Sequence, residues 1–442
     1  MNTVARVAAD SVGAAECISV TKYPDGMFNK TFLMTMEDGR EVVAKVPNPN
    51  AGILHFTTAS EVATMDFASR ILGTPAPHVH AWNSQAKSHP VGAEFILMDK
   101  VKGVPLSQIW STMQLQQRLK VIIAMTSLQK KWLSVSFSHY GSLYYAGDAQ
   151  SSAGSQYVKD GMAVKQSGFD IGPATGRDWF DADRLSLDIE RGPWPSLTPY
   201  LQAIGTREMK AIQSLKPPKQ VALFCGPKLY QPHAENTLIA LASYQRIVNA
   251  LTPTHTSIAN PRIWHNDLHD DNIFVDPHNP ERITGIIDWQ CCHISPLGLA
   301  PRPTLSGLSA EEWSAAKREY TIQNVFIGWR QLMQAKSPDL YCAVEFRKTA
   351  AYGPTSSDLK DTWSDLAGVT SDIPFPVDFS EIDIERIKLG SDDAAAETGL
   401  VSKVKEEVGD LWPDKGLIEH ERYDGYKAAL DEVKAQILKQ LA

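Results

Sequence analysis

Short apolar runs separated by turn residues dominate the N-terminal part of the chain. Residues 18–20, 32–36 and 41–46 are runs of this kind, and Asp38-Gly39 lies between the last two. Runs rich in Val, Ile and Phe are typical of strands, and an Asp-Gly pair between two of them is a strong signal for a tight hairpin. The pattern therefore predicts three short antiparallel strands that form a small sheet.

The spacing of apolar residues changes to a helical period after this sheet. Thr58 and Glu61 have the separation of a capping box, which predicts that a helix begins here. The apolar positions that then recur at helical intervals are Val62, Met65, Ala68 and Leu72. Residues 91–98 form a further strand-like run, followed by a polar connector at residues 99–103. This order of elements predicts a small lobe that contains both a sheet and a helix.

The remainder of the chain is predicted to be mainly helical, with one long irregular insert. Helical patterns cover residues 106–135, 200–215 and 232–251, and the chain is again mainly helical after residue 306. Residues 140–195 are rich in Gly, Ser, Asp, Pro and Trp. A stretch of this length without regular structure in a compact protein is usually functional or mobile.

The composition of the 442-residue chain is that of an ordinary globular protein. It is 43% hydrophobic and 21% charged, with a net charge of −8. An acidic chain without a dense run of Lys and Arg argues against nucleic acid as a partner. The longest apolar stretch, residues 121–125, is too short to span a membrane. We therefore expect neither a nucleic-acid partner nor a membrane span, and the composition predicts no oligomeric state.

The cysteines and the N-terminus bear on location. The five cysteines are Cys17, Cys225, Cys291, Cys292 and Cys342, without a C-x-x-C pair. This pattern predicts free thiols in a reducing compartment, with the adjacent Cys291 and Cys292 as metal ligands in an alternative interpretation. The N-terminus lacks the apolar core of a secretion signal, and its Asp10 and Glu16 are atypical of a mitochondrial presequence. We therefore expect a cytoplasmic protein.

A second predicted hairpin collects polar residues at its open end. Its strands are residues 273–275 and 283–287. Asn272 precedes the first strand and Asp288 follows the second, so antiparallel pairing brings both to the same end. Asp267 lies in the loop that leads into the hairpin. Two carboxylates and an amide oxygen are ligands that suit Mg²⁺, which retains waters and borrows substrate phosphates to complete its shell.

Two other interpretations of this segment stay open. In the first, the polar residues flank an ordinary hairpin and have no further role. In the second, His265, Asp267 and His269 bind a catalytic metal, such as zinc in a hydrolase. The second interpretation requires further ligands and leaves Asp288 without a role.

His265, Asp267 and Asn272, together with Asp288 and Trp289, carry a family resemblance. The pattern H-x-D-x-x-x-x-N, followed by an apolar hairpin and I-D-W, is similar to the loop of aminoglycoside phosphotransferases, choline kinases and protein kinases. The resemblance implies that Asp267 is the catalytic base and that Asn272 and Asp288 bind Mg²⁺. It implies that His265 orients the loop. It also implies an α+β, bilobal, protein-kinase-like fold with a small antiparallel-sheet N-terminal lobe and a mainly helical C-terminal lobe.

The same resemblance suggests roles in the N-terminal lobe. Lys45, on the third predicted strand, would contact the phosphates of ATP, and Glu61 on the following helix would pair with it. Otherwise Lys45 would be a solvated strand lysine and Glu61 a helix-capping acid. Gly26 and Asn29 lie in the turn between the first two strands, which would cover the phosphates. The hinge residues whose backbone would bind adenine are Met98, Asp99 and Val101.

The resemblance narrows to a fungal branch of the aminoglycoside phosphotransferase family, which includes altered inheritance of mitochondria protein nine. It covers roughly residues 10–295, and the segments that carry it are residues 25–30, 38–47, 56–67, 141–145 and 171–173. Residues 291–306 depart from the Asp-rich stretch that usually follows the metal aspartate in this family. The name of the branch implies a mitochondrial location, in contrast to the N-terminal sequence.

The resemblance also implies a domain organisation. Residues 1–98 would form the N-terminal lobe and residues 99–105 the hinge. Residues 106–335 would form the C-terminal lobe, which contains the insert at residues 140–195. Residues 336–442 would be a helical C-terminal extension.

The acceptor is expected to be a small molecule whose identity the sequence does not reveal. The acidic residues of the insert would suit a cationic acceptor or form a solvated loop; they are Asp178, Asp181, Asp183, Asp188 and Glu190. Trp179 and Trp194 would either stack on the acceptor or anchor the insert. We predict an ATP- and Mg²⁺-dependent phosphotransferase that acts on a hydroxyl group. The alternatives are a kinase fold that binds nucleotide or a partner without phosphoryl transfer, and a fold reused for other chemistry in secondary metabolism.

Overall fold

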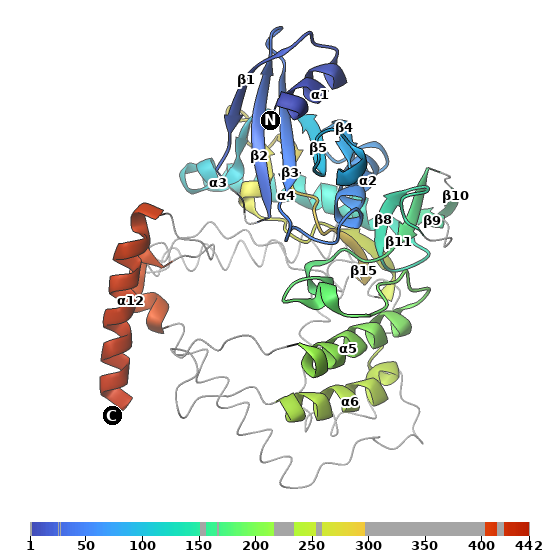
Figure 1. Cartoon of the computed structure of the whole chain (residues 1–442), viewed down its shortest axis with the longest axis vertical. Helices are drawn as coiled ribbons and strands as arrows, with labels where there is room; N and C mark the ends of the chain where they lie inside the picture. Colours follow the sequence, from blue (N-terminus) through green and yellow to red (C-terminus); the bar gives the residue numbers. More distant parts are fainter. Residues whose placement is uncertain are drawn as a thin grey trace.

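The computed structural model describes residues 2–24, 26, 28–150, 156–165, 168–215, 234–252, 259–296, 403–412 and 420–441. These residues form an α+β structure with a sheet-rich N-terminal lobe and a more helical C-terminal lobe (Figure 1). The predictions for residues 297–402, which include the departure from the family pattern up to residue 306 and the helical stretch after it, lie outside the described residues.

A five-stranded antiparallel sheet forms the N-terminal lobe (Figure 1). Its strands, in spatial order, are β1 (Cys17–Lys22), β2 (Asn29–Met36), β3 (Glu41–Pro47), β5 (Phe95–Asp99) and β4 (Val79–Asn83). The predicted tight turn joins β2 to β3, and Gly39 adopts a φ of 83° there, as an Asp-Gly turn requires. Strand β4 is absent from the sequence-based prediction because its half-buried, mixed residues show no alternation of apolar and polar positions.

Two helices cover the two faces of this sheet. They are α1 (Asn2–Val12) and α2 (Phe56–Arg70). Side chains alternate across a strand, so Phe95 and Leu97 pack in a cluster with α1 whereas Ile96 packs in the cluster that contains α2. The lobe therefore has a core on each side of the sheet.

The predicted capping box at the start of α2 is wrong. The helix begins at Phe56, after His55, without a side-chain cap. The hydroxyl of Thr58 instead donates to Glu94 at 2.5 Å, and Glu61 faces the interior of the molecule. Tertiary contacts with the sheet thus replace the local capping bonds that the spacing of Thr58 and Glu61 suggested.

The C-terminal lobe surrounds the polar hairpin with helices and short strands (Figure 1). Its longer helices are α4 (Leu115–Leu133), α5 (Leu197–Ser214) and α6 (Ala234–Leu251), preceded by the short helices α3 (Leu106–Ile109) and η2 (Trp110–Thr112). The hairpin strands β13 (Ile273–Val275) and β14 (Ile283–Ile286) pair with β6 (Val104–Pro105), and β12 (Pro261–Trp264) pairs with β15 (His293–Pro296). The helices agree with the predicted ranges, apart from a break between α3 and α4.

The insert contains more regular structure than the sequence predicted. Its strands are β8 (Ser142–Tyr145), β9 (Gln156–Lys159), β10 (Met162–Lys165) and β11 (Phe169–Gly172), and β9 also pairs with β7 (Val135–Phe137). The 3₁₀ helices η3 (Arg177–Trp179) and η4 (Arg184–Ser186) follow. These strands are only four residues long, too short for a clear alternating pattern, which explains why they resembled irregular loop.

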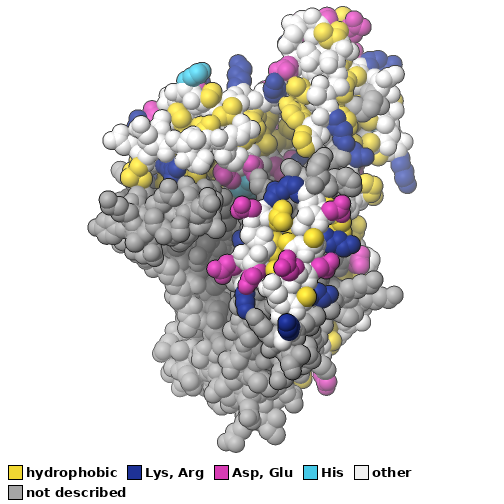
Figure 2. All heavy atoms as spheres, turned by 90° about the vertical axis from the view of Figure 1, so that its left-hand side faces the viewer, with side chains coloured by type: hydrophobic (Ala, Val, Ile, Leu, Met, Phe, Trp, Pro, Cys, Tyr) yellow, Lys and Arg dark blue, Asp and Glu magenta, His cyan; other side chains and the backbone are white. Residues whose placement is uncertain are grey.

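The last helix, α12 (His420–Leu441), follows the 3₁₀ helix η9 (Gly409–Leu411). Val433 of α12 packs against Val404 and Val408 in a small separate cluster. The face of α12 in Figure 2 carries acidic and basic side chains side by side. Among the described residues, none of the helices combines the length and the apolar character needed to cross a membrane.

Candidate active site

A short hairpin positions Asn272 and Asp288. Strands β13 and β14 are antiparallel, and the amide of Ile287 donates to the carbonyl of Asn272 at 3.0 Å. Asn272 and Asp288 therefore lie at the same end of the hairpin, as the pattern of the segment predicted. Asp288 has a φ of 61°, a conformation that is uncommon for residues other than glycine and that clusters at functional sites.

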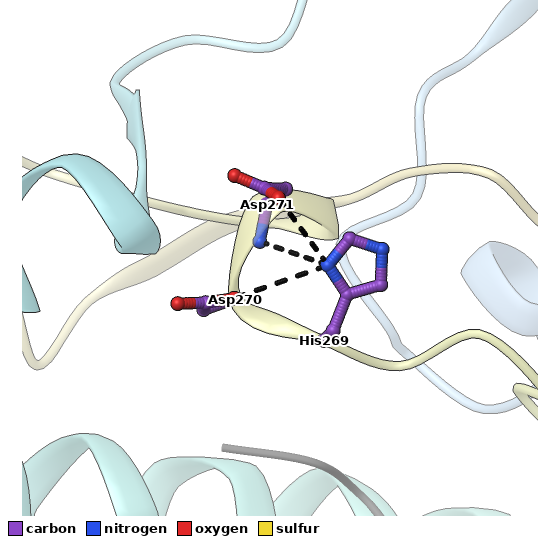
Figure 3. A group of neighbouring side chains, drawn as sticks. All are labelled: His269, Asp270 and Asp271. Atoms are coloured by element: carbon purple, nitrogen blue, oxygen red, sulfur yellow. Dashed lines mark hydrogen bonds and ion pairs between the residues drawn. The ribbon is translucent and has the colours of Figure 1, made fainter. Parts of the chain in front are cut away.

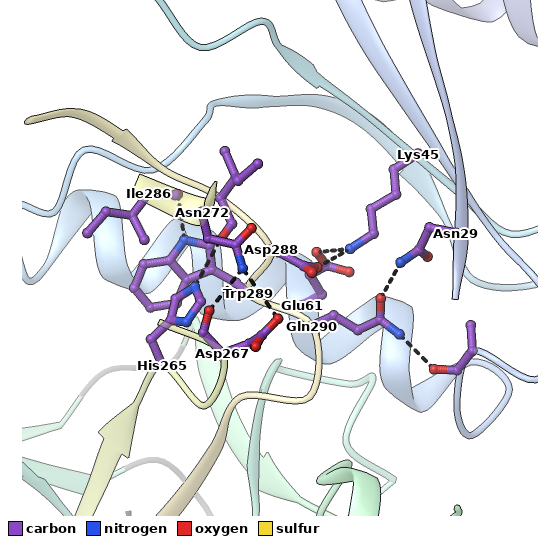
Figure 4. Close-up of polar contacts among 12 residues, drawn as sticks. Asn29, Lys45, Glu61, His265, Asp267, Asn272, Ile286, Asp288, Trp289 and Gln290 are labelled. Carbon is purple, nitrogen blue, oxygen red and sulfur yellow. Dashed lines mark hydrogen bonds and ion pairs between the residues drawn. The ribbon is translucent and has the colours of Figure 1, made fainter. Parts of the chain in front are cut away.

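Asp267 lies in the loop before this hairpin, and Asn272 holds it there. The Nδ2 of Asn272 donates to the backbone carbonyl of Asp267 at 2.9 Å and to its Oδ2 at 3.3 Å (Figure 4). The Asp267 side chain is still 61% exposed, so a solute can reach its carboxylate. Because Nδ2 makes these bonds, the Oδ1 of Asn272 is the oxygen that remains for another contact.

The imidazole of His269 lies beside the Asp267 carboxylate. Its Nδ1 accepts a hydrogen bond from the amide of Asp271 at 3.3 Å (Figure 3), and its Nε2 lies 3.6 Å from Oδ2 of Asp267. The His269 imidazole lowers the pKa of Asp267, and the carboxylate in turn raises the pKa of His269. Asp267 is therefore ionised at neutral pH and can accept a proton.

The structure brings two of the proposed zinc ligands, Asp267 and His269, within 3.6 Å of each other, but it does not gather all three with His265. Within the described residues, the acids and histidines that lie close enough to share a metal ion are His269, Asp270 and Asp271, whose ligand atoms lie within 4.8 Å of one another (Figure 3). His265 is not in this group. The hydroxyl of Ser107 donates to Asp271 at 2.6 Å and the amide of Asp271 bonds to His269, so local loop contacts account for the cluster.

His265 is buried beneath the loop and ties it to the hairpin. Its Nε2 lies 2.9 Å from the carbonyl oxygen of Ile287, which can only accept, so Nε2 carries the proton. Burial lowers the pKa of His265 and keeps the ring neutral at physiological pH. The ring also packs edge-on against Trp289, with 4.7 Å between the ring centroids. These contacts fit the orienting role predicted for His265.

Lys45 links the N-terminal lobe to the hairpin (Figure 4). Its Nζ lies 2.7 Å from Oε1 of Glu61 on α2 and 2.8 Å from Oδ1 of Asp288. Lys45 is only 5% exposed, so it is not the solvated strand lysine of the alternative interpretation. Glu61 is only 3% exposed, and α2 has no side-chain cap, so Glu61 is not the helix-capping acid either. Burial lowers the pKa of Lys45, but the carboxylates of Asp288 and Glu61 outweigh it and the pKa is raised. Burial also raises the pKa of Glu61, against the opposing effect of Lys45.

The turn between β1 and β2 makes a contact that the sequence did not predict. The amide of Gly26 donates to the carbonyl of Asn29 at 3.2 Å and closes the turn. The side chain of Asn29 then donates through Nδ2 to Oε1 of Gln290 at 2.6 Å (Figure 4). Gln290 was missed because the residues that it contacts lie far away in the sequence, so no local pattern marks it.

The predicted hinge residues lie at the end of β5 and just beyond it. The amide of Asp99 already donates to the carbonyl of His78 at 2.9 Å. The side chain of Val101 fits against Gly285, where a Cβ atom would lie only 2.3 Å from Cγ1 of Val101. The Asp99 amide would have to give up an existing bond to contact adenine. We therefore exclude the amide of Asp99 from the predicted adenine contacts. The remaining backbone groups of Met98, Asp99 and Val101 stay in the prediction.

The two tryptophans of the insert are structural anchors. Trp179 and Trp194 are 0% and 1% exposed, and their ring centroids lie 5.0 Å apart. The prediction that they stack on an acceptor is therefore wrong, and the alternative of a buried anchor is correct. Tyr200 of α5 packs in the same cluster, which fastens the insert to that helix.

Basic residues neutralise part of the acidic cluster of the insert. Asp178 forms an ion pair with Arg207, and Asp181 pairs with Arg177 at 2.9 Å. Arg207 is 5% exposed and also bonds to Glu208 at 2.7 Å. Asp178 therefore holds the insert against α5 and Asp181 pairs within the insert, which weakens the case for a cationic acceptor.

The sheet-rich N-terminal lobe, the hairpin of the C-terminal lobe and the Lys45–Asp288 contact between them are features of a kinase-like fold. Residues 19–299 match the model of the phosphotransferase enzyme family, abbreviated APH, and the chain belongs to this family.

Fungal relatives share a large part of the chain. It is similar to a subtelomeric hrmA-associated cluster protein of Aspergillus fumigatus, with 32% identity over 309 residues, or 63% of this chain and 58% of the relative. It is also similar to altered inheritance of mitochondria protein 9, mitochondrial, of Lachancea thermotolerans, with 24% identity over 71% of this chain and 53% of the relative. The chain thus spans little more than half the length of these relatives.

Solved structures of aminoglycoside phosphotransferases resemble the chain more distantly. The ternary complex of APH(2")-IIa with streptomycin and ATP has 14% identity and a TM-score of 0.37, and the match covers 79% of this chain and 97% of that one. APH(2'')-Ib bound to ADP has 12% identity and a TM-score of 0.39, over 87% and 95% of the two chains.

Proposed function

We propose that the protein is an ATP- and Mg²⁺-dependent phosphotransferase that acts on a hydroxyl group of a small molecule. The observation that carries the proposal is the position of Lys45, whose ammonium contacts Glu61 at 2.7 Å and Asp288 at 2.8 Å. A buried cation held by acids from both lobes, beside a loop with an exposed carboxylate, is the arrangement that kinase-like phosphoryl transfer uses.

Asp288 and Asn272 are the residues that would hold Mg²⁺. The Asp288 side chain is 37% exposed and Lys45 engages its Oδ1, so the second carboxylate oxygen remains for a cation. The bonds of Asn272 to Asp267 use its nitrogen, which leaves the Oδ1 oxygen for the same purpose. A carboxylate and an amide oxygen with access to water fit Mg²⁺. When bound, this ion would offset the negative charge of the phosphates.

The chain's own residues divide the remaining tasks. Asp267 would accept the proton of the attacking hydroxyl, since its carboxylate is exposed and ionised. Lys45 would hold the phosphates through its charge, and Glu61 would hold Lys45 in place. His265 and Asn272 would fix the geometry of the loop through their bonds to Ile287 and Asp267. The turn at Gly26 and the hinge after Met98 would enclose the nucleotide.

Nucleotide use draws support from Lys45, whose buried ammonium is held by Glu61 and Asp288 as a contact for phosphates. The acceptor is not inferred from the similar aminoglycoside phosphotransferases, because the acids that would suit a cationic acceptor are partly engaged in ion pairs of the insert. We retain a cytoplasmic location as part of the proposal, and imaging of the tagged protein would distinguish it from the mitochondrial location that the relative's name states.

The substitution Asp267→Asn tests the mechanism. It removes the proton acceptor but keeps the shape of an exposed side chain, so the fold and the affinity for Mg-ATP should change little. Phosphoryl transfer should fall by about 10²–10⁴-fold. The acceptor would first be found by incubating the protein with a metabolite extract and ATP, and by detecting compounds that gain one phosphoryl group in mass.

Two outcomes would count against the proposal. If the Asp267→Asn variant transferred phosphate at the original rate, Asp267 would not be the base. If the unmodified protein bound Mg-ATP but phosphorylated nothing in such extracts, the alternative of a nucleotide-binding protein without transfer would be favoured. Failure to bind Mg-ATP in calorimetry would contradict both.

A further inference from the structure

Gln290 connects two segments of the N-terminal lobe to the loop that follows the hairpin (Figure 4). Its Oε1 accepts a hydrogen bond from Nδ2 of Asn29 at 2.6 Å, and its Nε2 donates to the carbonyl of Ala51 at 2.6 Å. Gln290 and Ala51 are 8% and 3% exposed, so solvent competes little for these bonds. One side chain, two positions after Asp288, thus spans the two lobes.

The direction of these bonds is fixed by chemistry. The carbonyl of Ala51 can only accept, so Gln290 must present its Nε2 to Ala51 and its Oε1 to Asn29. Asn29 must then present Nδ2, which leaves its Oδ1 buried without a protein partner. In this arrangement the Oδ1 of Asn29 is buried without a hydrogen-bond partner among the described residues. The orientation of the Asn29 side chain is therefore determined by the hydrogen bond from its Nδ2 to Gln290.

A second contact fastens the same turn to the C-terminal lobe. The guanidinium of Arg177, at the start of η3 in the insert, lies over the ring of Phe28, 4.5 Å from its centroid. Phe28 is next to Asn29 in the sequence, and its carbonyl also accepts from the amide of Asn48 at 2.8 Å. The turn that would cover the phosphates is therefore bound from two sides, by Gln290 and by Arg177.

We propose that Gln290 is a positioning residue that fastens the turn at Phe28-Asn29 to the loop of Asp288, so that nucleotide phosphates are held between them. This inference rests on the proposed function and extends it. Asp288 would contact the metal-bound phosphates from one side, and the turn would cover them from the other. A hydrogen bond between the two segments fixes the space in which the phosphates fit. The turn is then already ordered, so a smaller cost of ordering it is subtracted from the free energy of nucleotide binding.

The test compares Gln290→Ala with the matched control Gln245→Ala. Gln245 also donates to a backbone carbonyl, that of Gln202 at 2.9 Å, but it lies where α6 contacts α5, in a part of the C-terminal lobe away from the turn (Figure 1). Because Gln290 is buried, Asn29→Ala provides a second test of the same bond from the more exposed side. Calorimetric titration with Mg-ADP, and hydrogen exchange of residues 26–31 in the nucleotide-free protein, are the measurements.

We expect Gln290→Ala and Asn29→Ala each to weaken Mg-ADP binding by about five- to tenfold. The double variant should bind Mg-ADP within about twofold of either single variant, because both substitutions remove the same hydrogen bond. The KM for ATP should rise by a similar factor, with a smaller change in kcat. Exchange in residues 26–31 should accelerate in both variants, and Gln245→Ala should match the unmodified protein in every measurement.

The failure of this inference can be distinguished from the failure of the proposed function. If the unmodified protein binds Mg-ADP and the two variants bind it equally well, Gln290 does not position the turn, whatever the exchange shows. If the unmodified protein binds no nucleotide, the proposed function is wrong. In that case hydrogen exchange alone tests whether Gln290 fastens the turn. If residues 26–31 exchange at the same rate in the variants as in the unmodified protein, Gln290 does not fasten the turn.

Discussion

The Nζ of Lys45 lies 2.8 Å from Oδ1 of Asp288, although the two residues are 243 positions apart in the chain. Lys45 belongs to the sheet of the N-terminal lobe and Asp288 to the loop after the hairpin of the C-terminal lobe. The contact therefore joins the lobes at the point where the phosphates of a nucleotide would lie. Glu61 holds the same ammonium from α2, so Lys45 is already oriented before any ligand binds.

The first prediction concerns the stability of this arrangement. Lys45→Met leaves the buried carboxylate of Glu61 without its cation, which should lower the free energy of unfolding by about 3 kcal/mol. Adding Glu61→Gln should recover part of that loss, because it removes the unpaired charge. Urea denaturation of the single and double variants would measure both effects.

Lys100→Met is the matched control for Lys45→Met. Lys100 also pairs with a glutamate, Glu41, at 2.7 Å, but both side chains are well exposed, at 40% and 37%. Its loss should cost less than about 1 kcal/mol. If the two substitutions lowered the free energy of unfolding equally, burial would not be what makes the Lys45–Glu61 ion pair important for stability.

The second prediction separates the metal from the fold. Asp288→Ala should weaken Mg-ADP binding at least about tenfold and remove much of its dependence on Mg²⁺ concentration, since it deletes a proposed metal ligand. It should destabilise the protein less than Lys45→Met does, because Lys45 still neutralises Glu61. Calorimetry at several Mg²⁺ concentrations would measure the effect. If the variant kept the Mg²⁺ dependence of the unmodified protein, the assignment of Asp288 as a Mg²⁺ ligand would be contradicted. The control is Asp38→Ala, which removes an exposed ion pair.

The hairpin could be predicted from the sequence because its information is local. The strands of residues 273–275 and 283–287 adjoin a short turn, and strand pairing alone then places Asn272 next to Asp288. Lys45 and Glu61 were found differently, through the resemblance to a family, because nothing in their own neighbourhoods requires them to meet. The structure brings these two residues together at 2.7 Å.

Contacts between distant segments explain what could not be predicted. Asn29 and Gln290 are 261 positions apart, and neither lies in a pattern that indicates the other. The burial of Trp179 and Trp194 depends on how the insert packs against α5. The capping box at Thr58 failed for a related reason, because Glu94, far along the chain, supplies the better hydrogen-bond partner.

The third prediction tests the core beneath the loop of His265 and Asp267. Trp289 is 1% exposed, packs against Trp132 with 5.8 Å between ring centroids, and donates through Nε1 to the carbonyl of Ile286 at 2.9 Å. Trp289→Ala should destabilise the protein by about 3–5 kcal/mol. Trp289→Phe should cost less, since it keeps an aromatic ring but leaves that carbonyl unpaired.

Thermal unfolding of the Trp289 variants would rank these costs. Leu54→Ala is the control, because Leu54 is 73% exposed and its truncation should change stability by less than about 0.5 kcal/mol. If Trp289→Ala were as stable as this control, the ring would not support the loop of His265 and Asp267. Trp289→Phe should also keep Mg-ADP affinity within about threefold, because the removed atoms face the core.

The fourth prediction is a dependence of stability on pH. Glu208 of α5 bonds to Arg184 of the insert at 2.6 Å and to Arg207, its neighbour on α5, at 2.7 Å. Burial raises the pKa of Glu208, but the two arginines outweigh it and the pKa is lowered. A carboxylate with a lowered pKa stabilises the fold fully above its ordinary pKa of about 4.3, and loses that contribution as the pH falls through its pKa in the folded protein. Glu208→Gln should therefore lower the free energy of unfolding by about 1 kcal/mol at pH 7 and by progressively less at acidic pH.

Thermal unfolding between pH 7 and pH 3 would measure the difference. Glu281→Gln is the control, because the ion pair of Glu281 with Lys120 is exposed. A cost for Glu208→Gln that stayed constant over this range would show that the charge of Glu208 does not hold the insert to α5.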